Sequence, residues 1–237
     1  MEAGAVSGRN PAAGIRSTPQ RDPTAGGDAR ESQRSPGITI ADPGPLGLAA
    51  FALTTFMLSA ANAGIFGQVG LGAKGPGTVP IVLALALAYG GIAQLLAGMW
   101  EFRTGNTFGA VAFTSFGAFW LSFWAFVQFF AKDIPDATNL GHAVGLYLIG
   151  WGIFTTYMFV ASLRTTGAIA VVFLLLAITF WILGFGNYNA SMNTIKLGGY
   201  FGLATAIAAW YASFAAVTNA TFEKIVLPVI SLKKERR

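Results

Sequence analysis

The chain has 237 residues, of which 54% are hydrophobic and only 11% are charged, and its formal net charge is +5. This balance excludes a water-soluble domain of this size. The chain has no cysteine, which excludes disulfides and thiol chemistry, and its basic residues are better explained by membrane topology than by affinity for nucleic acid.

The first forty residues differ in composition from the rest. They are rich in Gly, Pro, Ser, Ala and Arg and contain no long apolar run. They lack the apolar core of a signal peptide, and their composition is typical of disordered chain. We therefore expect a disordered cytoplasmic tail at 1–40, a transmembrane domain at 41–222 and a basic cytoplasmic tail at 223–237.

Six apolar runs follow, each close to the roughly 20 residues that a helix needs to cross about 30 Å of hydrocarbon. They cover roughly 46–69, 79–100, 108–131, 142–162, 167–185 and 198–218. Strands of an outer-membrane barrel would be shorter and would alternate polar with apolar residues, which these runs do not. The sequence predicts an all-α fold, a six-transmembrane-helix bundle in a polytopic membrane protein.

Basic residues are divided unevenly between the two sides of this bundle. If both termini lie on one side, that side carries Arg103, Arg164 and five basic residues of the C-terminal tail, whereas the opposite connections carry one each, namely Lys74, Lys132 and Lys196. Basic residues favour the cytoplasmic side. We therefore expect a multi-pass protein of the cell (plasma) membrane with both termini in the cytoplasm.

Residues 41–51 lead from the tail into the first span. Asp42 is a residue type that caps helix N-termini, and Pro43 suits the first helical position, where a missing N–H costs nothing. Gly47 leaves the helix surface bare for a close neighbour. The order Pro-x-Pro-Leu-Gly-Leu-x-x-Phe resembles a motif of the acetate uptake transporter family, which comprises the bacterial succinate-acetate permeases and the fungal acetate transporters. The motif residues are Asp42, where the family has Asn, then Pro43, Pro45, Leu46, Gly47 and Leu48, with Gly44 as a second departure.

Two further segments carry the same resemblance. Gly90-Gly91-Ile92-Ala93-Gln94 lies in the second span and Gly105-Asn106-Thr107-Phe108-Gly109 follows it, so the match covers about residues 42–230. Thr104 or Asn106 can cap the third helix, whose exposed N–H groups favour an approaching anion. A carboxylate could be bound there without a charged side chain.

None of the six spans has an Asp, Glu, Lys, Arg or His in its central part. Acid–base or metal chemistry would need clustered His, Cys, Asp or Glu, so we expect no enzyme, no metal site and no cofactor. Hydrogen bonding between helices is the simplest role for the neutral polar side chains, although the larger amides are better suited to contact a small polar solute. The substrate-binding candidates are Thr54, Asn62, Gln94, Asn106 and Thr114.

The resemblance also implies a constriction in the substrate path. An aromatic residue of span one, an aromatic residue of span three and a Leu of span five are thought to form an apolar ring in the family, and the matching residues here are Phe51, Phe116 and Leu176. The family often has Tyr in span three, so Phe116 would make the ring drier. An apolar constriction can gate by dewetting.

Small residues recur every four positions on the sixth span, at Gly198, Gly202 and Ala206. This spacing lets helices approach closely, which suits a compact bundle, a subunit interface or both. The resemblance implies a homo-oligomer, with six subunits.

We therefore expect a carrier or channel for acetate and related short carboxylates, including succinate, that is coupled to protons. A path without charged side chains favours passage of the neutral acid, because a bare anion would lose its hydration in the apolar ring. Two alternatives remain open. One is passive anion flow through a briefly wetted gate, and the other is an ammonia or ammonium-type channel, which commonly places paired His residues in its pore, whereas His142 stands alone near a span end.

Overall fold

A computed structural model describes residue 1, residues 40–65 and residues 78–232. The helices belong to one compact unit that begins at Ala41. Within the described residues, six helices are long and apolar enough to cross a membrane. The all-α, six-helix prediction is confirmed, whereas the predicted disordered tail at 1–40 lies almost entirely outside the described residues.

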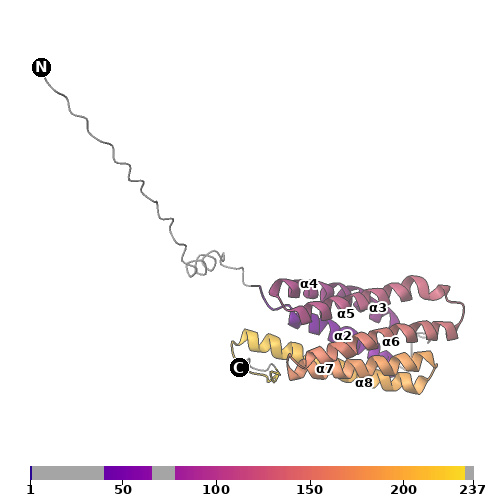
Figure 1. Ribbon diagram of the computed structural model, residues 1–237. Coiled ribbons are helices and arrows are strands. Elements are labelled where there is room, and N and C mark those ends of the chain that lie inside the picture. The colour runs from indigo at the N-terminus through magenta and orange to yellow at the C-terminus, as the bar shows by residue number, and fades with distance from the viewer. Residues whose placement is uncertain (2–39, 66–77, 233–237) are drawn as a thin grey trace. The chain divides into compact units, whose positions relative to one another are not determined.

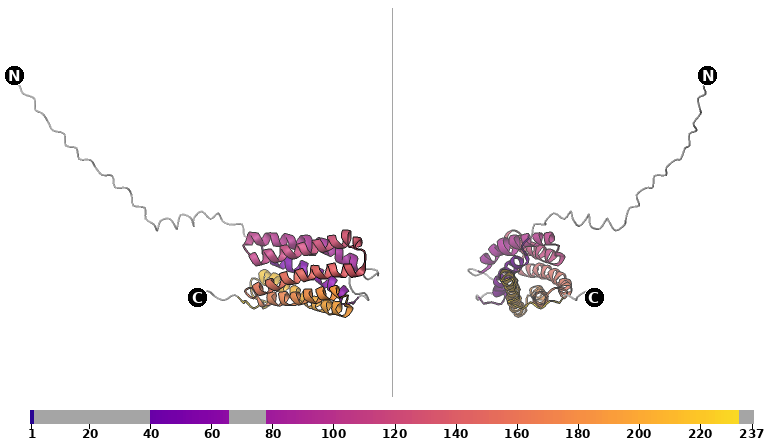
Figure 2. Two further views of the ribbon diagram at one scale, coloured as in Figure 1. Left: turned by 45° about the vertical axis from the view of Figure 1, so that its right-hand side comes forward. Right: turned by 90° about the vertical axis from the view of Figure 1, so that its left-hand side faces the viewer.

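The six spans run side by side along the bundle (Figures 1 and 2). The first is α2 (Gly44–Asn62), and the second joins α3 (Thr78–Leu87), the π-helical η1 (Ala88–Ala93) and α4 (Gln94–Thr104). The third joins α5 (Thr107–Ala125), the π-helical η2 (Phe126–Phe130) and the short 3₁₀ helix η3 (Ala131–Asp133). The last three are α6 (Ala137–Ser162), α7 (Gly167–Tyr188) and α8 (Met192–Thr221).

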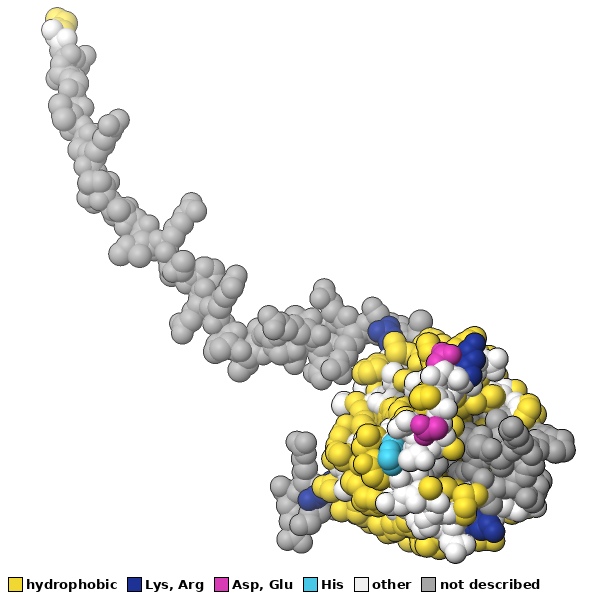
Figure 3. Space-filling model, turned by 90° about the vertical axis from the view of Figure 1, so that its right-hand side faces the viewer, with side chains coloured by type: hydrophobic (Ala, Val, Ile, Leu, Met, Phe, Trp, Pro, Cys, Tyr) yellow, Lys and Arg dark blue, Asp and Glu magenta, His cyan; other side chains and the backbone are white. Residues whose placement is uncertain are grey.

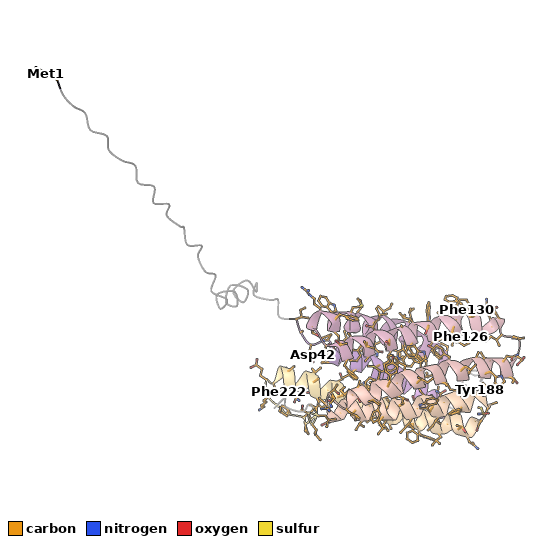
Figure 4. All side chains as sticks on the ribbon, viewed as in Figure 1. Met1, Asp42, Phe126, Phe130, Tyr188 and Phe222 are labelled. Atoms are coloured by element: carbon orange, nitrogen blue, oxygen red, sulfur yellow. The ribbon has the colours of Figure 1, made fainter. Side chains whose placement is uncertain are left out.

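The bundle has two ends, which Figure 4 makes easy to find. Asp42 and Phe222 lie at one end, and Phe130 and Tyr188 lie at the opposite end. We call the first the proximal end and the second the distal end. Because the spans alternate in direction, α2, α5 and α7 all run from the proximal to the distal end.

Polar side chains fix where several helices begin. The side chain of Asn106 accepts a hydrogen bond from the Gly109 N–H at 3.1 Å, so its predicted role as the cap of α5 is confirmed. The prediction for α2 was wrong by one residue, because Pro43 is the N-cap and Gly44 the first helical residue. The Asp42 side chain instead accepts the Gly44 N–H at 2.8 Å. Pro45 then occupies a first-turn position whose N–H is not needed.

The first span ends before the expected residue 69. Gly64 adopts a positive φ of 76°. The N–H groups of Gly64 and Ile65 donate to the carbonyls of Ala61 and Ala60, at 3.1 Å each. This pairing closes the C-terminus of a helix, so α2 stops at Asn62 although apolar residues continue beyond it.

Small residues bring α8 close to its neighbours. A Cβ added at Gly202 would overlap Ser59 of α2, and one at Gly198 would meet Leu183 of α7. Ala206 is fully buried. The predicted small-residue stripe therefore packs against helices of the same chain.

Viewed from its distal end, the bundle has hydrophobic side chains around much of its outer edge (Figure 3), and its sides are apolar. Large exposed side chains recur every seven residues on two outer helices, at Leu146, Ile153 and Val160 of α6 and at Tyr200, Ile207 and Phe214 of α8. Apolar surface of this extent is unfavourable in water. The natural neighbours of these faces are lipid and other membrane-embedded protein.

Candidate functional site

Among the described residues, three cavities follow one another from the proximal to the distal end. The proximal cavity has about 420 Å³ and lies where α2, α5 and α7 begin and α4 and α8 end. The distal cavity has about 360 Å³ and lies where α2, α5 and α7 end. A central cavity of about 30 Å³ lies between them and shares five of its lining residues with the distal cavity.

The same three helices, α2, α5 and α7, line all three cavities. On each helix a subset of the lining residues is spaced by three, four or seven positions and so lies on one face. From the proximal to the distal cavity they are Leu48, Phe51, Thr55, Leu58 and Asn62 on α2, Ala112, Phe119 and Phe123 on α5, and Phe173, Leu176, Phe180, Leu183 and Asn187 on α7. The cavities therefore form one line along the bundle.

The predicted ring residues lie where this line narrows. Phe51, Phe116 and Leu176 are all buried, and each follows a residue that lines the proximal cavity by three or four positions. The ring centroids of Phe51 and Phe116 are 5.8 Å apart. Phe51 and Leu176 both line the central cavity. The structure thus brings an aromatic pair and a Leu from three helices to one level, which we call the waist.

More aromatic rings surround the waist than the sequence predicted. The centroid of Phe116 lies 6.1 Å from that of Phe173 and 6.3 Å from that of Phe180. Phe154 of α6 meets Phe116 edge-to-face at 5.4 Å. Such packed apolar side chains offer no hydrogen bonds to a passing charge, so an ion at this level would lose its hydration without compensation.

Two polar groups in the central cavity have no hydrogen-bond partner among the described residues. They are the Thr55 hydroxyl and the Trp120 indole N–H, and both are buried. Leaving a buried polar group unpaired costs about 1–3 kcal/mol. Sequence reasoning named Thr54 and missed Thr55 and Trp120. The sequence spacing could have identified Thr55, because Thr55 lies four residues after Phe51 and so shares its helix face.

The five predicted substrate-binding residues fall into two groups. Asn62 lines the central and distal cavities, and Asn106 lines the proximal one. The other three, Thr54, Gln94 and Thr114, line none of these cavities as the described residues outline them.

Two of the residues outside the cavities lie at helix contacts. Thr54 donates to the Ala50 carbonyl at 2.9 Å and packs where a Cβ at Gly90 would clash. Thr114 fills the space over Gly98 in the same way. These contacts place Thr54 between α2 and η1 and Thr114 between α4 and α5.

The rim of the proximal cavity carries a carboxyl group to which the sequence assigned no role. Glu101 is only 2% exposed, and its Oε2 accepts a hydrogen bond from the Thr104 hydroxyl at 3.1 Å. Its Oε1 lies against Gly44, the first residue of α2, and against Gly109, in the first turn of α5. Glu101 and Asp42 line this cavity together with Asn106. The proximal mouth therefore combines two carboxyl groups with two helix N-termini.

The predicted close approach at Gly47 is confirmed. A Cβ at this position would lie 2.6 Å from the ring of Phe113, so only glycine leaves room for the α5 side chain. Phe113 in turn lines the proximal cavity. The motif at the start of α2 thus shapes the wall of that cavity.

Comparison with known proteins gives a family and several relatives. A family model described as the GPR1/FUN34/yaaH family matches residues 26–234. Acetate permease A of Emericella nidulans is 41% identical over 204 residues, which are 80% of this chain and 66% of the relative. Ammonia transport outward protein 2 of Saccharomyces cerevisiae is 41% identical over 187 residues, 76% of this chain and 62% of the relative. The chain thus spans less than two thirds of the length of these fungal relatives.

Bacterial relatives match over nearly their whole length. The succinate-acetate/proton symporter SatP of Escherichia coli is 38% identical over 190 residues, 80% of this chain and 95% of the symporter. A solved structure of the bacterial acetate channel SatP superposes with a TM-score of 0.72 at 38% identity, covering 81% of this chain and 99% of that one. The helical bundle described above is therefore shared with a solved relative.

Proposed function

This chain belongs to the GPR1/FUN34/yaaH family, and we propose that it moves acetate and related short carboxylates, including succinate, across a membrane. It is a multi-pass membrane protein by its six spans. Its relatives are named as a permease, a symporter and a channel, which confirms that the chain is not an enzyme. The observation that carries the proposal is the line of three cavities on α2, α5 and α7 with an apolar waist.

The waist favours transport of the carboxylic acid in its neutral form. A short carboxylic acid has a pKa near 4–5, so protonating it at pH 7 costs about 3–4 kcal/mol. Burying an unpaired carboxylate costs more, at least several kcal/mol and far more in a dry interior. Because protonation is the cheaper route, the proton travels with the substrate past Phe51, Phe116 and Leu176. This coupling would make uptake proton-dependent without a charged residue at the waist.

The unpaired groups beyond the waist give the acid its first hydrogen bonds. The Trp120 indole N–H is a donor, and the Thr55 hydroxyl can donate or accept, which matches the carbonyl and hydroxyl of a neutral carboxyl group. The Asn62 amide follows at the boundary with the distal cavity. At about 30 Å³ the central cavity has room for roughly one water. The waist side chains must therefore move when an acid passes.

Our proposal includes the location and assembly of the protein. We place it in the plasma membrane with the proximal end, and hence both termini, in the cytoplasm. The two proximal connections and the chain after α8 together carry more basic residues than the three distal connections, and the excess comes from the residues after α8. We also propose a homo-oligomer, with six subunits by resemblance, which would cover part of the apolar faces of α6 and α8.

Uptake of labelled acetate into proteoliposomes tests this function. Because acetic acid crosses lipid by itself, the informative quantity is the initial rate above that of vesicles with a Leu176→Trp variant, whose waist is filled. A matched control, Leu174→Trp, alters an exposed position of the same helix. We expect a protein-dependent rate that rises when the outside is more acidic and that survives in the control variant. Equal rates for native protein, Leu176→Trp and protein-free vesicles would refute the proposal.

A passive anion channel is the second candidate, favoured by the description of the solved relative as an acetate channel. In a channel the waist would wet briefly and the carboxylate would pass without a proton. Ammonia conduction is a further alternative, which the name of the yeast relative suggests for that protein. The same vesicles distinguish acetate transport from ammonia conduction. Protein-dependent alkalinisation of the lumen by ammonia, without acetate uptake, would favour the ammonia function.

A further inference from the structure

After α8, the described part of the predicted basic tail, up to residue 232, packs against the bundle. It reverses at Glu223, whose φ is 51°, and returns toward the start of α7. We call residues 225–232 the return segment. Figure 1 shows it beside α7 and α8 at the proximal end.

A single side chain of α8 makes three hydrogen bonds to the return segment. The Asn219 Oδ1 accepts the N–H groups of Val226 and Leu227, at 2.7 and 2.9 Å, and its Nδ2 donates to the Leu227 carbonyl at 2.9 Å. Tyr211 adds a hydrogen bond from its hydroxyl to the Pro228 carbonyl at 2.6 Å. All three of these Asn219 side-chain hydrogen bonds therefore hold the return segment against α8.

The far end of the return segment pairs with the start of α7. The Gly167 N–H donates to the Ile230 carbonyl at 2.7 Å, and the Leu232 N–H donates to the Thr165 carbonyl at 3.0 Å. The first N–H groups of a helix otherwise lack a partner. The segment is thus fastened to α8 at one end and to α7 at the other.

Between these fastenings, the return segment contributes Val229 to two cavities, both of which Ala168 of α7 also lines. Val229 lines the proximal cavity, together with Asn219 and Thr166. It also lines a groove on the outside of the bundle, between α7 and α8. The adjacent Ile230 is 71% exposed. Val229 therefore stands in the partition between the proximal cavity and the membrane-facing surface.

We propose that the return segment is a wall of the substrate vestibule, that Val229 contacts the alkyl part of the acid there, and that Asn219 is the positioning residue for this wall. The proximal cavity has polar lining at Asp42, Glu101 and Asn106, near the starts of α2 and α5. Near α7 and α8 it is lined by the apolar Val229 and Ile169, with Thr165, Thr166 and Asn219 beside them. A short carboxylate fits this division, with its carboxyl group toward the start of α5 and its alkyl group toward the return segment. The identity of the occupant rests on the proposed function, whereas the existence of the wall does not.

Site-directed labelling tests the wall directly, because the chain has no cysteine. Single variants Val229→Cys, Ile230→Cys and Ala216→Cys of the full chain are modified with a small neutral thiol reagent, with and without acetate. Ala216 lines the same cavity from α8 and reports on the occupant independently of the return segment. A ligand at ten times its dissociation constant should slow modification of a covered site by about ten-fold. We expect this protection at positions 229 and 216 and none at 230.

The positioning role is tested in the Val229→Cys background. Asn219→Ala removes all three hydrogen bonds and is expected to speed labelling and abolish protection. Asn219→Asp keeps the two acceptor bonds and should retain part of the protection. Global unfolding would also expose the α8 site, so unchanged labelling of Ala216→Cys in the Asn219→Ala background separates local release from misfolding.

The outcomes are distinguishable. Protection by acetate at position 216 without protection at 229 would refute the proposal that the return segment is a wall. A labelling rate of Val229→Cys that Asn219→Ala leaves unchanged would refute it as well. Protection at neither position would refute acetate as the occupant. The wall would then stand if Asn219→Ala still speeds labelling at 229, and it would fall if the rate is unchanged.

Discussion

Shortening Leu176 to Ala should relax the size selectivity of the waist. Leu176 is 3% exposed and lines the central cavity, whose volume of about 30 Å³ is too small for any acid without movement of side chains. One methylene in an apolar site is worth about 1–3 kcal/mol in selectivity, or about 10–200-fold. Removing the Leu side chain should therefore raise uptake of lactate relative to acetate by about ten-fold or more.

The assay must separate selectivity from loss of fold. Truncating a buried Leu to Ala costs about 2–5 kcal/mol of unfolding free energy, so the variant has to be monodisperse before its uptake is compared. Leu174→Ala, on the exposed side of the same helix, should leave the acid profile unchanged. The measurement is the ratio of initial rates for labelled lactate and acetate in proteoliposomes. An unchanged ratio in well-folded Leu176→Ala protein would refute the placement of Leu176 in the path.

Three further changes test other parts of the account. Asp42→Asn should keep the hydrogen bond to the Gly44 N–H and raise apparent acetate affinity from the proximal side, most clearly at low salt, where charges are unscreened over about 10 Å. Asp42→Ala should instead cost about 0.5–2 kcal/mol of stability. If the acetate affinity of Asp42→Asn equals that of the native protein at every salt concentration, Asp42 serves only the helix start. Trp120→Phe removes an unpaired indole N–H and should leave stability equal or higher by up to about 1–3 kcal/mol while slowing acetate uptake, whereas unchanged uptake would argue against a carboxyl contact. Gly202→Ala should destabilise the protein by about 1–3 kcal/mol because a Cβ there overlaps Ser59, whereas Gly150→Ala, where the described residues leave open space, should be neutral or stabilising in the same thermal melt.

Much of the fold follows from local features of the sequence. Six runs of apolar residues predict six spans, because length and hydropathy alone decide whether a helix can cross a bilayer. The capping role of Asn106 is equally local, since a side chain and an N–H three residues later suffice. The start of α2 was misplaced by one residue, because two prolines and an Asp offer several nearly equivalent starts.

Features that depend on distant contacts could not be predicted. The end of α2, by contrast, is set locally by the positive φ at Gly64 and the hydrogen bonds to Ala60 and Ala61, and it was missed because apolar residues continue beyond it. The return segment depends on Asn219 and on α7, which lie outside its own sequence. Glu101 lies close to a span end, where a carboxyl group is ordinarily solvated, and its burial arises only when α2 and α5 begin beside it.

The candidate site was partly predictable for the same reason. The family motifs point to Phe51, Phe116 and Leu176, and these residues meet at one level. Polar candidates chosen by residue type alone include Thr54, which faces another helix, and omit Thr55, which faces the cavity. Residue type suggests the chemistry, but the face of the helix decides whether a side chain reaches the path.

Acetate flux under an imposed membrane potential tests the central claim most directly, which is that the acid passes the waist together with its proton. Proteoliposomes are held at equal pH on both sides, and a potassium gradient with an ionophore sets the potential. A monocarboxylate that moves with one proton carries no net charge, so the protein-dependent flux is predicted to be the same at zero, positive and negative potential. A flux that increases or reverses with the potential would show that the bare anion crosses the waist and would contradict the account.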